Sequence, residues 1–341
     1  MIQEAIKKIS KKENLSRDEA EIVFDEIMNG ETKLEEIVEL LLALNEKGET
    51  IEEIQGAAES MRKVVSEVKH NATNVLDVVG TGGDGKNSFN VSTTSAIVAA
   101  GAGCIVAKHG NKSVSSNSGA ADVLKELGVN IETNAEKNAR ILAKIGFCFM
   151  FAQMHHPAMK YAAGPRKEIG KRTIFNILGP ITNPAKANTY LLGAYSEELA
   201  EKLANVLAGL DTKHALVVYG QGYDEASLIG KTVYFEIEKG IVERKEITPE
   251  EAGLPSCSEE DLKVSGPEES AKIILAILKG KDRGAKRNTI LLNAGMAIYA
   301  NKKAKTILEG IEKAKESIDS GNALKKLNEL IEATNETEAT K

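Results

Sequence analysis

The residues best suited to chemistry lie in and beside the segment between Asp84 and Asp122, which contains no carboxylate. Asp and Glu outnumber Lys and Arg by 50 to 44 in the chain as a whole, so this gap is unusual. A Gly-rich run at 80–85 precedes the gap, while Asn, Ser, Thr and Lys gather within it at 90–93 and 108–118. Backbone amides, hydroxyls and a few cations are the groups that bind phosphate. The sequence therefore predicts an anion site here.

The Gly-rich run also has the spacing G-x-G-x-x-G, through Gly80, Gly82 and Gly85. In a dinucleotide site, an acidic residue about 20 residues later holds the ribose hydroxyls. Here the next predicted strand ends instead in Lys108 and His109, which suit a phosphate. A Walker-type loop is excluded because Lys86 is not followed by Ser or Thr. A Gly-rich turn without any ligand, and plain helix caps in the Asn and Ser that follow, remain the alternatives.

Two adjacent carboxylates, Asp224 and Glu225, follow a predicted strand at 215–219 and a turn at 220–222. Adjacent acids on a loop are usually just solvated. At the carboxyl end of a strand, however, they would share an edge with the Gly-rich run, and carboxylates that face phosphates need a cation between them. Mg²⁺ is the natural choice, because it is held by one or two carboxylates and by phosphate oxygens.

A third dense stretch, 153–184, contains His155, His156 and several basic residues. A metal site at the two histidines is disfavoured, because no third ligand stands at a useful spacing and Pro157 follows directly. Arg166 is either a surface residue or a residue whose guanidinium binds the carboxylate of a substrate through two hydrogen bonds.

The composition excludes several classes of protein. The net charge of −6 gives no positive field to hold nucleic acid or an anionic membrane. Three widely spaced cysteines suit reduced thiols in a cytoplasmic protein. The N-terminus lacks the apolar core of a secretory signal. Residues 87–107 carry no charge, but their Asn, Ser, Thr and Gly content favours a buried strand-loop-helix segment over a membrane span.

The N-terminal 70 residues read as about four helices. Capping boxes at 16–19 and 50–53 start two of them, and Gly30 and Gly48 stand where helices would end. Such a small module would expose apolar faces alone, so it must pack on the rest of the chain or on a second copy.

From residue 71 onward, short apolar runs alternate with Gly-rich turns and helices. This pattern is typical of an α/β fold with a mostly parallel sheet flanked by helices, whose ligands bind at the carboxyl ends of strands. We expect strands at 75–79, 104–107, 147–151 and 215–219, an edge hairpin at 232–247, helices at 92–101, 121–127, 287–301 and 303–332, and a polar tail at 333–341.

Several segments in order resemble the anthranilate phosphoribosyltransferases, whose fold is shared with the pyrimidine nucleoside phosphorylases. The matching segments span nearly the whole chain and are 77–84, 89–93, 108–115, 156–160, 172–180 and 224–225. The resemblance implies transfer of a phosphoribosyl group from 5-phosphoribosyl 1-diphosphate (PRPP) to the amine of anthranilate, releasing diphosphate. This reaction is the second step of tryptophan synthesis from chorismate.

The resemblance also implies the site residues, none of which acts as an acid or base. PRPP would be held by Gly80, Gly83, Asp84, Ser88, Asn90, Val91, Ser92, Thr93, Lys108, His109, Gly110, Asn111, Lys112, Ser113, Val114, Ser115 and Ser116. The cofactor Mg²⁺ would be coordinated by Ser92, Asp224 and Glu225. Anthranilate would contact Gly80, Asn111, Arg166, His156 and Pro180.

By the same resemblance, a small helical domain at 1–70 packs with residues 165–185 and forms a homodimer, while 71–341 is the large PRPP-binding domain. Two departures from the family pattern stand near these sites. Asn117 and Ala120 replace a Lys and a Ser, and Gly164 with Pro165 replaces a Pro-Val pair before the Arg.

Two other functions fit the architecture. A pyrimidine nucleoside phosphorylase would use inorganic phosphate and a nucleoside, but its Gly-loop and basic signatures differ from those of this chain. A non-catalytic relative that binds nucleic acid would have a basic surface and would lack the metal acids, whereas this chain is acidic and retains Asp224 and Glu225.

Overall fold

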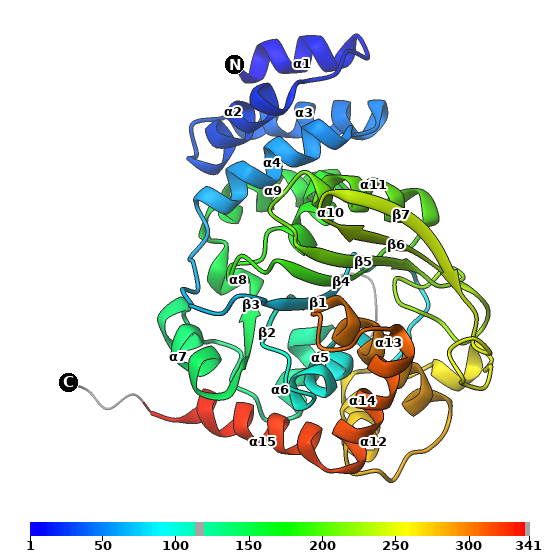
Figure 1. Cartoon of the computed structure of the whole chain (residues 1–341). Helices are drawn as coiled ribbons and strands as arrows, with labels where there is room; N and C mark the ends of the chain where they lie inside the picture. The colour runs from blue at the N-terminus through cyan, green and yellow to red at the C-terminus, as the bar shows by residue number, and fades with distance from the viewer. Residues whose placement is uncertain (113–118, 338–341) are drawn as a thin grey trace.

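The computed structural model describes residues 1–112 and 119–337 and shows a small helical module above a larger α/β body (Figure 1). The module opens with α1 (Ile2–Ser10), α2 (Arg17–Met28), α3 (Leu34–Lys47) and α4 (Ile51–Lys63). Both predicted capping boxes are confirmed, with Ser16 capping α2 and Thr50 capping α4. Gly30 and Gly48 follow α2 and α3 with φ values of 75° and 84°, which side chains disfavour.

Seven strands form one sheet in the order β3-β2-β1-β4-β5-β6-β7. The pairs among the first five are parallel, and β6 and β7 add an antiparallel hairpin at the edge. The chain leaves β1 toward β2 and β3, then returns to β4 on the other side of β1, so β1 and β4 flank the topological switch point. The strands are β1 (Leu76–Gly80), β2 (Val106–Gly110), β3 (Phe147–Phe151), β4 (Thr189–Gly193), β5 (His214–Tyr219), β6 (Thr232–Glu238) and β7 (Ile241–Ile247).

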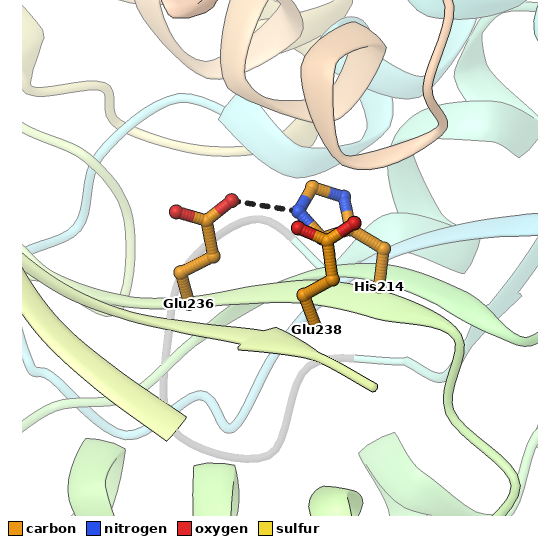
Figure 2. Close-up of side chains that lie close together, drawn as sticks. All are labelled: His214, Glu236 and Glu238. Atoms are coloured by element: carbon orange, nitrogen blue, oxygen red, sulfur yellow. Dashed lines mark hydrogen bonds and ion pairs between the residues drawn. The ribbon is translucent and has the colours of Figure 1, made fainter. Parts of the chain in front are cut away.

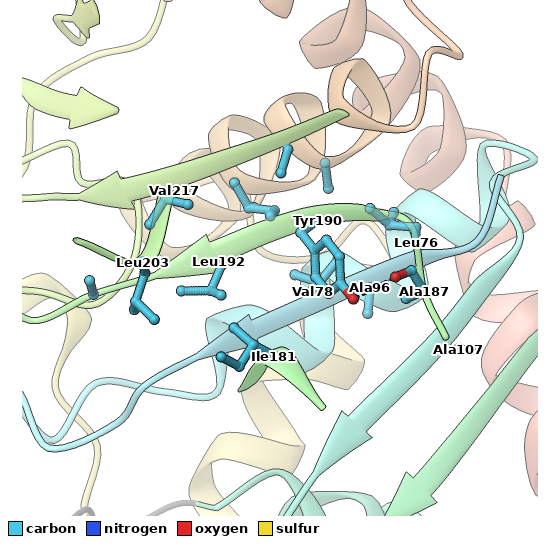
Figure 3. Packing of buried hydrophobic residues seen from close by; sticks show 14 of the residues in the cluster. Leu76, Val78, Ala96, Ala107, Ile181, Ala187, Tyr190, Leu192, Leu203 and Val217 are labelled. Atoms are coloured by element: carbon cyan, nitrogen blue, oxygen red, sulfur yellow. Dashed lines mark hydrogen bonds between the residues drawn. The ribbon is translucent and has the colours of Figure 1, made fainter. Parts of the chain in front are cut away.

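Helices cover both faces of this sheet (Figure 1). On one face lie α5 (Val91–Gly101), α13 (Ala285–Ala300), α14 (Ile307–Asp319) and α15 (Asn322–Asn335), and on the face toward the helical module lies α11 (Glu197–Ala208). The core between these layers includes Val78, Leu192 and Val217 from adjacent strands (Figure 3). The α/β body also contains α6 (Ala120–Glu126), α7 (Ala135–Ile145), α8 (Ala152–His155) and α12 (Pro267–Leu278). Within the described ranges, no helix combines the length and apolar character needed to cross a membrane.

Two later helices pack against the N-terminal module. Helix α9 (Lys160–Ile169) contacts α2 and α3, and α10 (Ile174–Ile181) contacts α3 and α4. The rings of Phe24 and Phe175 meet edge to face at 5.8 Å between centroids. Arg62 on α4 donates hydrogen bonds of 3.1 and 2.7 Å to the carbonyl of Ile181 at the end of α10. These contacts attach the N-terminal helices to the segment that precedes β4.

The structure differs from the sequence prediction at several elements. Strand β4 and helices α8, α9, α10 and α12 were not predicted. Helix α15 extends to Asn335, into the segment predicted as a polar tail. The helix predicted at 303–332 is instead two helices, α14 and α15, which are separated at Gly321 with φ of 80°. The predicted edge hairpin is confirmed as β6 and β7.

A buried network ties this hairpin to β5 and α13 (Figure 2). Oε1 of Glu236 lies 2.7 Å from Nε2 of His214 and accepts a 2.6 Å hydrogen bond from the hydroxyl of Tyr299. Lys245 donates to Oε2 of the same carboxylate at 2.6 Å. Burial acts to raise the pKa of Glu236, but the hydrogen bonds from His214, Lys245 and Tyr299 together lower that pKa to about 2.

His214, Glu236 and Glu238 are also close enough together to bind a metal ion. The surrounding contacts argue against a metal. Lys245 pairs with Glu236, and Lys302 pairs with Glu238 at 2.8 Å. Nδ1 of His214 lies 2.8 Å from the carbonyl oxygen of Ala300, to which it donates. We interpret the cluster as an ion-pair network that holds the sheet edge.

We predict that Glu236→Gln destabilises the protein by about 1 to 3 kcal/mol near pH 7, because the buried carboxylate's hydrogen bonds with His214, Lys245 and Tyr299 are weakened or lost. The pKa of Glu236 is depressed on folding, so its contribution is present above its ordinary pKa of 4.5 and is lost as the pH falls toward 2. Urea unfolding followed by circular dichroism between pH 7 and pH 3.5 measures the gap in the free energy of unfolding between the wild type and Glu236→Gln. This gap should narrow at the acidic end.

Glu243→Gln is the matched control, because Glu243 pairs with the same Lys245 at 2.9 Å but is largely exposed. Its cost should stay below about 1 kcal/mol. Equal costs for the two variants, or a gap that does not change with pH, would contradict the network interpretation.

Candidate active site

The site is built where β1 and β4 end side by side. Gly80 and Gly193 are paired at the last position of their strands. The loop that follows β5 crosses over both ends and places Asp224 directly against them. A Cβ atom at either glycine would overlap Asp224, so both positions require glycine for this close approach. Oδ2 of Asp224 also accepts a 2.6 Å hydrogen bond from the N–H of Gly82.

This loop brings carboxylates together away from bulk water. Burial, together with repulsion from Asp84, raises the pKa of Asp224 to about 7. Burial and the charges of Asp224 and Asp84 raise the pKa of Glu225 well above its ordinary value. Such shifts arise where like charges are desolvated without enough cations nearby. Asp224 and Glu225 thus offer hard oxygen donors, which fits Mg²⁺.

The loop is held in place by Asn293 of α13. Its Oδ1 accepts from the N–H of Ala226 at 2.9 Å, and its Nδ2 donates to the carbonyl of Ala226 at 2.8 Å. This two-sided contact immobilises the backbone next to Glu225. Asn293 was not singled out from the sequence, although a polar residue inside an otherwise apolar helix was a signal for it.

Lys108 supplies a buried positive charge across from the acids. Its Nζ lies 2.5 Å from the carbonyl of Val78 and 3.3 Å from Oγ of Ser92. Burial lowers the pKa of Lys108 to about 8, while the carboxylates of Asp77, Glu225 and Asp224 act in the opposite direction. The ammonium group therefore stands beside the first turn of α5, where the N–H groups favour an anion.

Asn90 caps this helix, since its side chain accepts a 3.0 Å hydrogen bond from the N–H of Thr93. The cap interpretation is thus confirmed, and it places Val91, Ser92 and Thr93 in the first turn of α5. Val91 and Thr93 are buried, whereas Ser92 is partly exposed. The cap and the anion site are compatible, because capping is what aims this helix end toward the Gly-rich run.

Asp77 and Asn183 form the scaffold beneath the basic side. Oδ1 of Asp77 accepts from the N–H of His109 at 3.1 Å, and Oδ2 accepts from Nδ2 of Asn183 at 2.6 Å. Asn183 also donates to the carbonyl of Ala107 at 2.9 Å. Burial raises the pKa of Asp77 to about 6. These bonds fix β1, β2 and the segment after α10 relative to one another.

Two neighbouring histidines line the side of the site near α10. The rings of His109 and His156 are 4.9 Å apart between centroids, and Nδ1 of His109 lies 3.1 Å from the carbonyl of Gly179, beside Pro180. Burial lowers the pKa of both rings, that of His156 to about 4, so both are neutral at pH 7. Nε2 of each ring is buried and has no partner within the described part of the chain. This wall therefore offers polar atoms to a neutral or aromatic ligand.

His155, in contrast, is structural. Its two ring nitrogens lie 3.1 Å from the carbonyl of Ser66 and 3.0 Å from Nδ2 of Asn138. The structure does not bring His155 and His156 together as metal ligands.

Arg166 lies on α9, partly buried, with its guanidinium carbon 5.8 Å from the ring centroid of Phe175. Burial lowers its pKa. No carboxylate of the described chain pairs with it, and no hydrogen bond joins it to the Gly-rich run. Gly164 and Pro165 are accommodated within the same helix.

The other predicted site residues lie on the loops around this centre. Gly83 faces Arg172, which was not among the predicted residues although it stands in a matching segment. Ser88 forms an isolated bridge with Lys263. Gly110 ends β2, and Oδ1 of Asn111 accepts from the N–H of Lys112 at 2.8 Å. Ser113, Val114, Ser115 and Ser116 lie outside the described residues.

Comparison with known proteins assigns the family. Residues 72–324 match the α/β domain of a glycosyl transferase family, and residues 3–64 match the helical bundle domain of a glycosyl transferase family. The anthranilate phosphoribosyltransferase of Methanobrevibacter smithii is 50% identical over 336 residues, covering 98% of this chain and 100% of that protein.

Two solved structures are similar over nearly the full length. The anthranilate phosphoribosyltransferase of Thermus thermophilus gives a TM-score of 0.93 at 40% identity and covers 97% of this chain and 99% of its own. The enzyme of Saccharomyces cerevisiae in complex with PRPP and Mg gives 0.89 at 32% identity, with coverages of 98% and 97%. This chain therefore belongs to the glycosyl transferase family with a helical bundle and an α/β domain, among its anthranilate phosphoribosyltransferases.

Proposed function

We propose that this chain transfers the phosphoribosyl group of PRPP to the amine of anthranilate, yielding N-(5-phosphoribosyl)anthranilate and diphosphate. The proposal rests on the apposition of two partly buried acids, Asp224 and Glu225, and a Gly-rich loop at the switch point of the sheet. Acids at Asp224 and Glu225 serve no purpose beside a phosphate unless a cation joins them. The relatives named above and the yeast complex with PRPP and Mg support the same reaction.

The donor side of the site is proposed to be the β1–α5 and β2–α6 region of a large domain spanning 71–341. Gly80, Gly83 and Asp84 would cradle the diphosphate with Ser88 and the first turn of α5. The ammonium group of Lys108 would offset the negative charge of the diphosphate. Gly110, Asn111, Lys112 and the segment 113–116 would complete the PRPP site.

Catalysis in this reaction means stabilising a leaving group. As the bond between the anomeric carbon and diphosphate breaks, negative charge grows on the diphosphate and positive charge on the sugar. Mg²⁺, held by Asp224, Glu225 and Ser92, would supply Lewis-acid stabilisation of that charge. Lys108 adds a fixed positive charge at the end of α5. The scaffold of Asp77 and Asn183 keeps β2, and hence Lys108, in place.

The acceptor side is proposed to lie between the small and large domains. The wall of His109, His156 and Pro180 suits an aromatic ring, and Asn111 and Arg166 would hold its carboxylate. An aromatic amine is neutral at pH 7 and already nucleophilic, so positioning it behind the anomeric carbon suffices and no general base is required. The small domain would then comprise 1–70 together with about 165–185, in keeping with the packing of α9 and α10 on the N-terminal helices.

We also propose a cytoplasmic homodimer. Exposed apolar side chains stand on α2, α3 and α4, namely Ile22, Leu34, Leu42 and Ile51. Large apolar groups gathered on one small module are typical of an interface. Sedimentation equilibrium tests this proposal, and a single species of 36.6 kDa would refute it.

The activity itself is tested by following the loss of anthranilate fluorescence with purified protein, PRPP and Mg²⁺. We expect a loss that requires both PRPP and Mg²⁺ and that stops on addition of EDTA. Asp224→Asn should lower kcat/KM by about 100-fold, because charge stabilisation in the transition state is weakened. Full activity in EDTA, or no turnover by folded protein with Mg²⁺, would contradict the proposal.

Arg166→Ala should raise the KM for anthranilate about tenfold or more, because a charge-assisted hydrogen bond to its carboxylate is lost. The KM for PRPP should stay within about twofold, since no contact joins Arg166 to the Gly-rich run. Steady-state kinetics with each substrate varied in turn measures both values. Equal rises for the two substrates would refute this acceptor role.

A further inference from the structure

Arg172 reaches from the acceptor side of the site to the donor side. It precedes α10, which carries Pro180, and its guanidinium donates a hydrogen bond to the carbonyl of Gly83 in the Gly-rich run. The guanidinium carbon also lies 4.0 Å from the ring centroid of Tyr195, just beyond β4. Arginine stacks on aromatic rings through its planar, weakly hydrated group, so Tyr195 gives this exposed side chain a fixed platform.

The Gly-rich run is consequently held from two sides. The N–H of Gly82 donates to Asp224, and the carbonyl of Gly83 accepts from Arg172. Gly83 has φ of 80°, and a Cβ atom there would overlap the guanidinium. The positive φ therefore favours glycine at this position, and the absence of a side chain lets Arg172 approach the backbone.

The contact with Arg172 fixes the direction of a peptide plane. In a trans peptide the carbonyl and the following N–H point in opposite directions. With the carbonyl of Gly83 turned toward Arg172, the N–H of Asp84 is turned away from it. An anion that approaches the loop from that side meets an N–H group, and not a carbonyl oxygen that would repel it.

We propose that Arg172 is a positioning residue of the donor site, which sets the orientation of the Gly83–Asp84 peptide for binding the diphosphate of PRPP. This inference rests on the proposed function and deepens it. Arg172 acts through the backbone of Gly83, and Tyr195 acts through Arg172. Loss of the contact leaves the peptide free to turn its carbonyl toward the anion, which weakens donor binding.

A competing explanation is that Arg172 only adds positive charge near an anionic substrate. Lys171 provides the matched control, because it is the adjacent residue, is exposed and carries the same charge. A general charge effect would weaken PRPP binding equally when Lys171 or Arg172 is replaced. Positioning through Gly83 would weaken PRPP binding only in the variants that disturb the guanidinium of Arg172.

The test measures the dissociation constant of PRPP by titration calorimetry with Mg²⁺ present, together with steady-state kinetics, for the wild type, Arg172→Ala, Arg172→Lys, Tyr195→Ala and Lys171→Ala. Arg172→Ala should weaken PRPP binding about tenfold, the size expected for a lost hydrogen bond to a charged group. Arg172→Lys should recover little of this, because an ammonium group cannot both stack on Tyr195 and reach Gly83 in the same geometry. The dissociation constant of Tyr195→Ala for PRPP should lie between those of the wild type and Arg172→Ala. That of Lys171→Ala should stay within about twofold of the wild type.

The KM for anthranilate at saturating PRPP should stay within about twofold in every variant. Equal losses in Lys171→Ala and Arg172→Ala, full rescue by Arg172→Lys, or a fall in kcat with unchanged PRPP binding would each overturn the proposal. Thermal unfolding of each variant separates a folding defect from a binding defect. The calorimetric measurement needs no turnover, so a failure of the transferase reaction is distinguishable from a failure of this inference.

Discussion

The site depends on one close approach, that of Asp224 to the ends of β1 and β4: its carboxylate lies against Gly80 and its backbone carbonyl lies against Gly193. Only glycine at positions 80 and 193 leaves room for it, and the loop after β5 must cross both strand ends to deliver it. The approach removes Asp224 and Glu225 from water and raises their pKa values. The ionised carboxylates are therefore unfavourable there by themselves, and a bound cation would stabilise them. Asn293 and the sheet itself stabilise a loop that carries this electrostatic cost.

Around this point the charges are arranged by sign. Acids stand on the loop after β5, while Lys108 stands at the end of β2 with its charge directed to the first turn of α5. A diphosphate bound between them, as we propose, would meet a cation on one side and the carboxylates proposed to bind the metal on the other. Arg166 lies on α9, which packs on the helical module, whereas Lys108 and His109 lie on β2, so the proposed donor and acceptor groups come from different parts of the chain. Domain closure about the junction would bring the two together.

Much of the donor side was predictable from the sequence, because its residues are local. The Gly-rich run, the cap at Asn90 and the strand that carries Lys108 lie within a short segment, and turn and cap chemistry identify the first two. Gly193 was missed because β4 was not predicted, and without β4 the switch point between β1 and β4 cannot be located. Asn293 and Arg172 could not be assigned, since the backbone groups they bind, at Ala226 and Gly83, are distant in sequence. Local rules predict elements, whereas contacts between them require the fold.

We infer that Asp224 and Glu225 bind the metal ion on one side of a phosphate site at the switch point of the sheet. Anomalous scattering from Mn²⁺ in crystals grown with PRPP tests it most directly, because Mn²⁺ replaces Mg²⁺ at oxygen sites and is located without assumptions. We expect a peak within bonding distance of the Asp224 or Glu225 carboxylate, in contact with diphosphate oxygens. A fully bound PRPP with no peak there, or a peak only at His214 and Glu236, would contradict it.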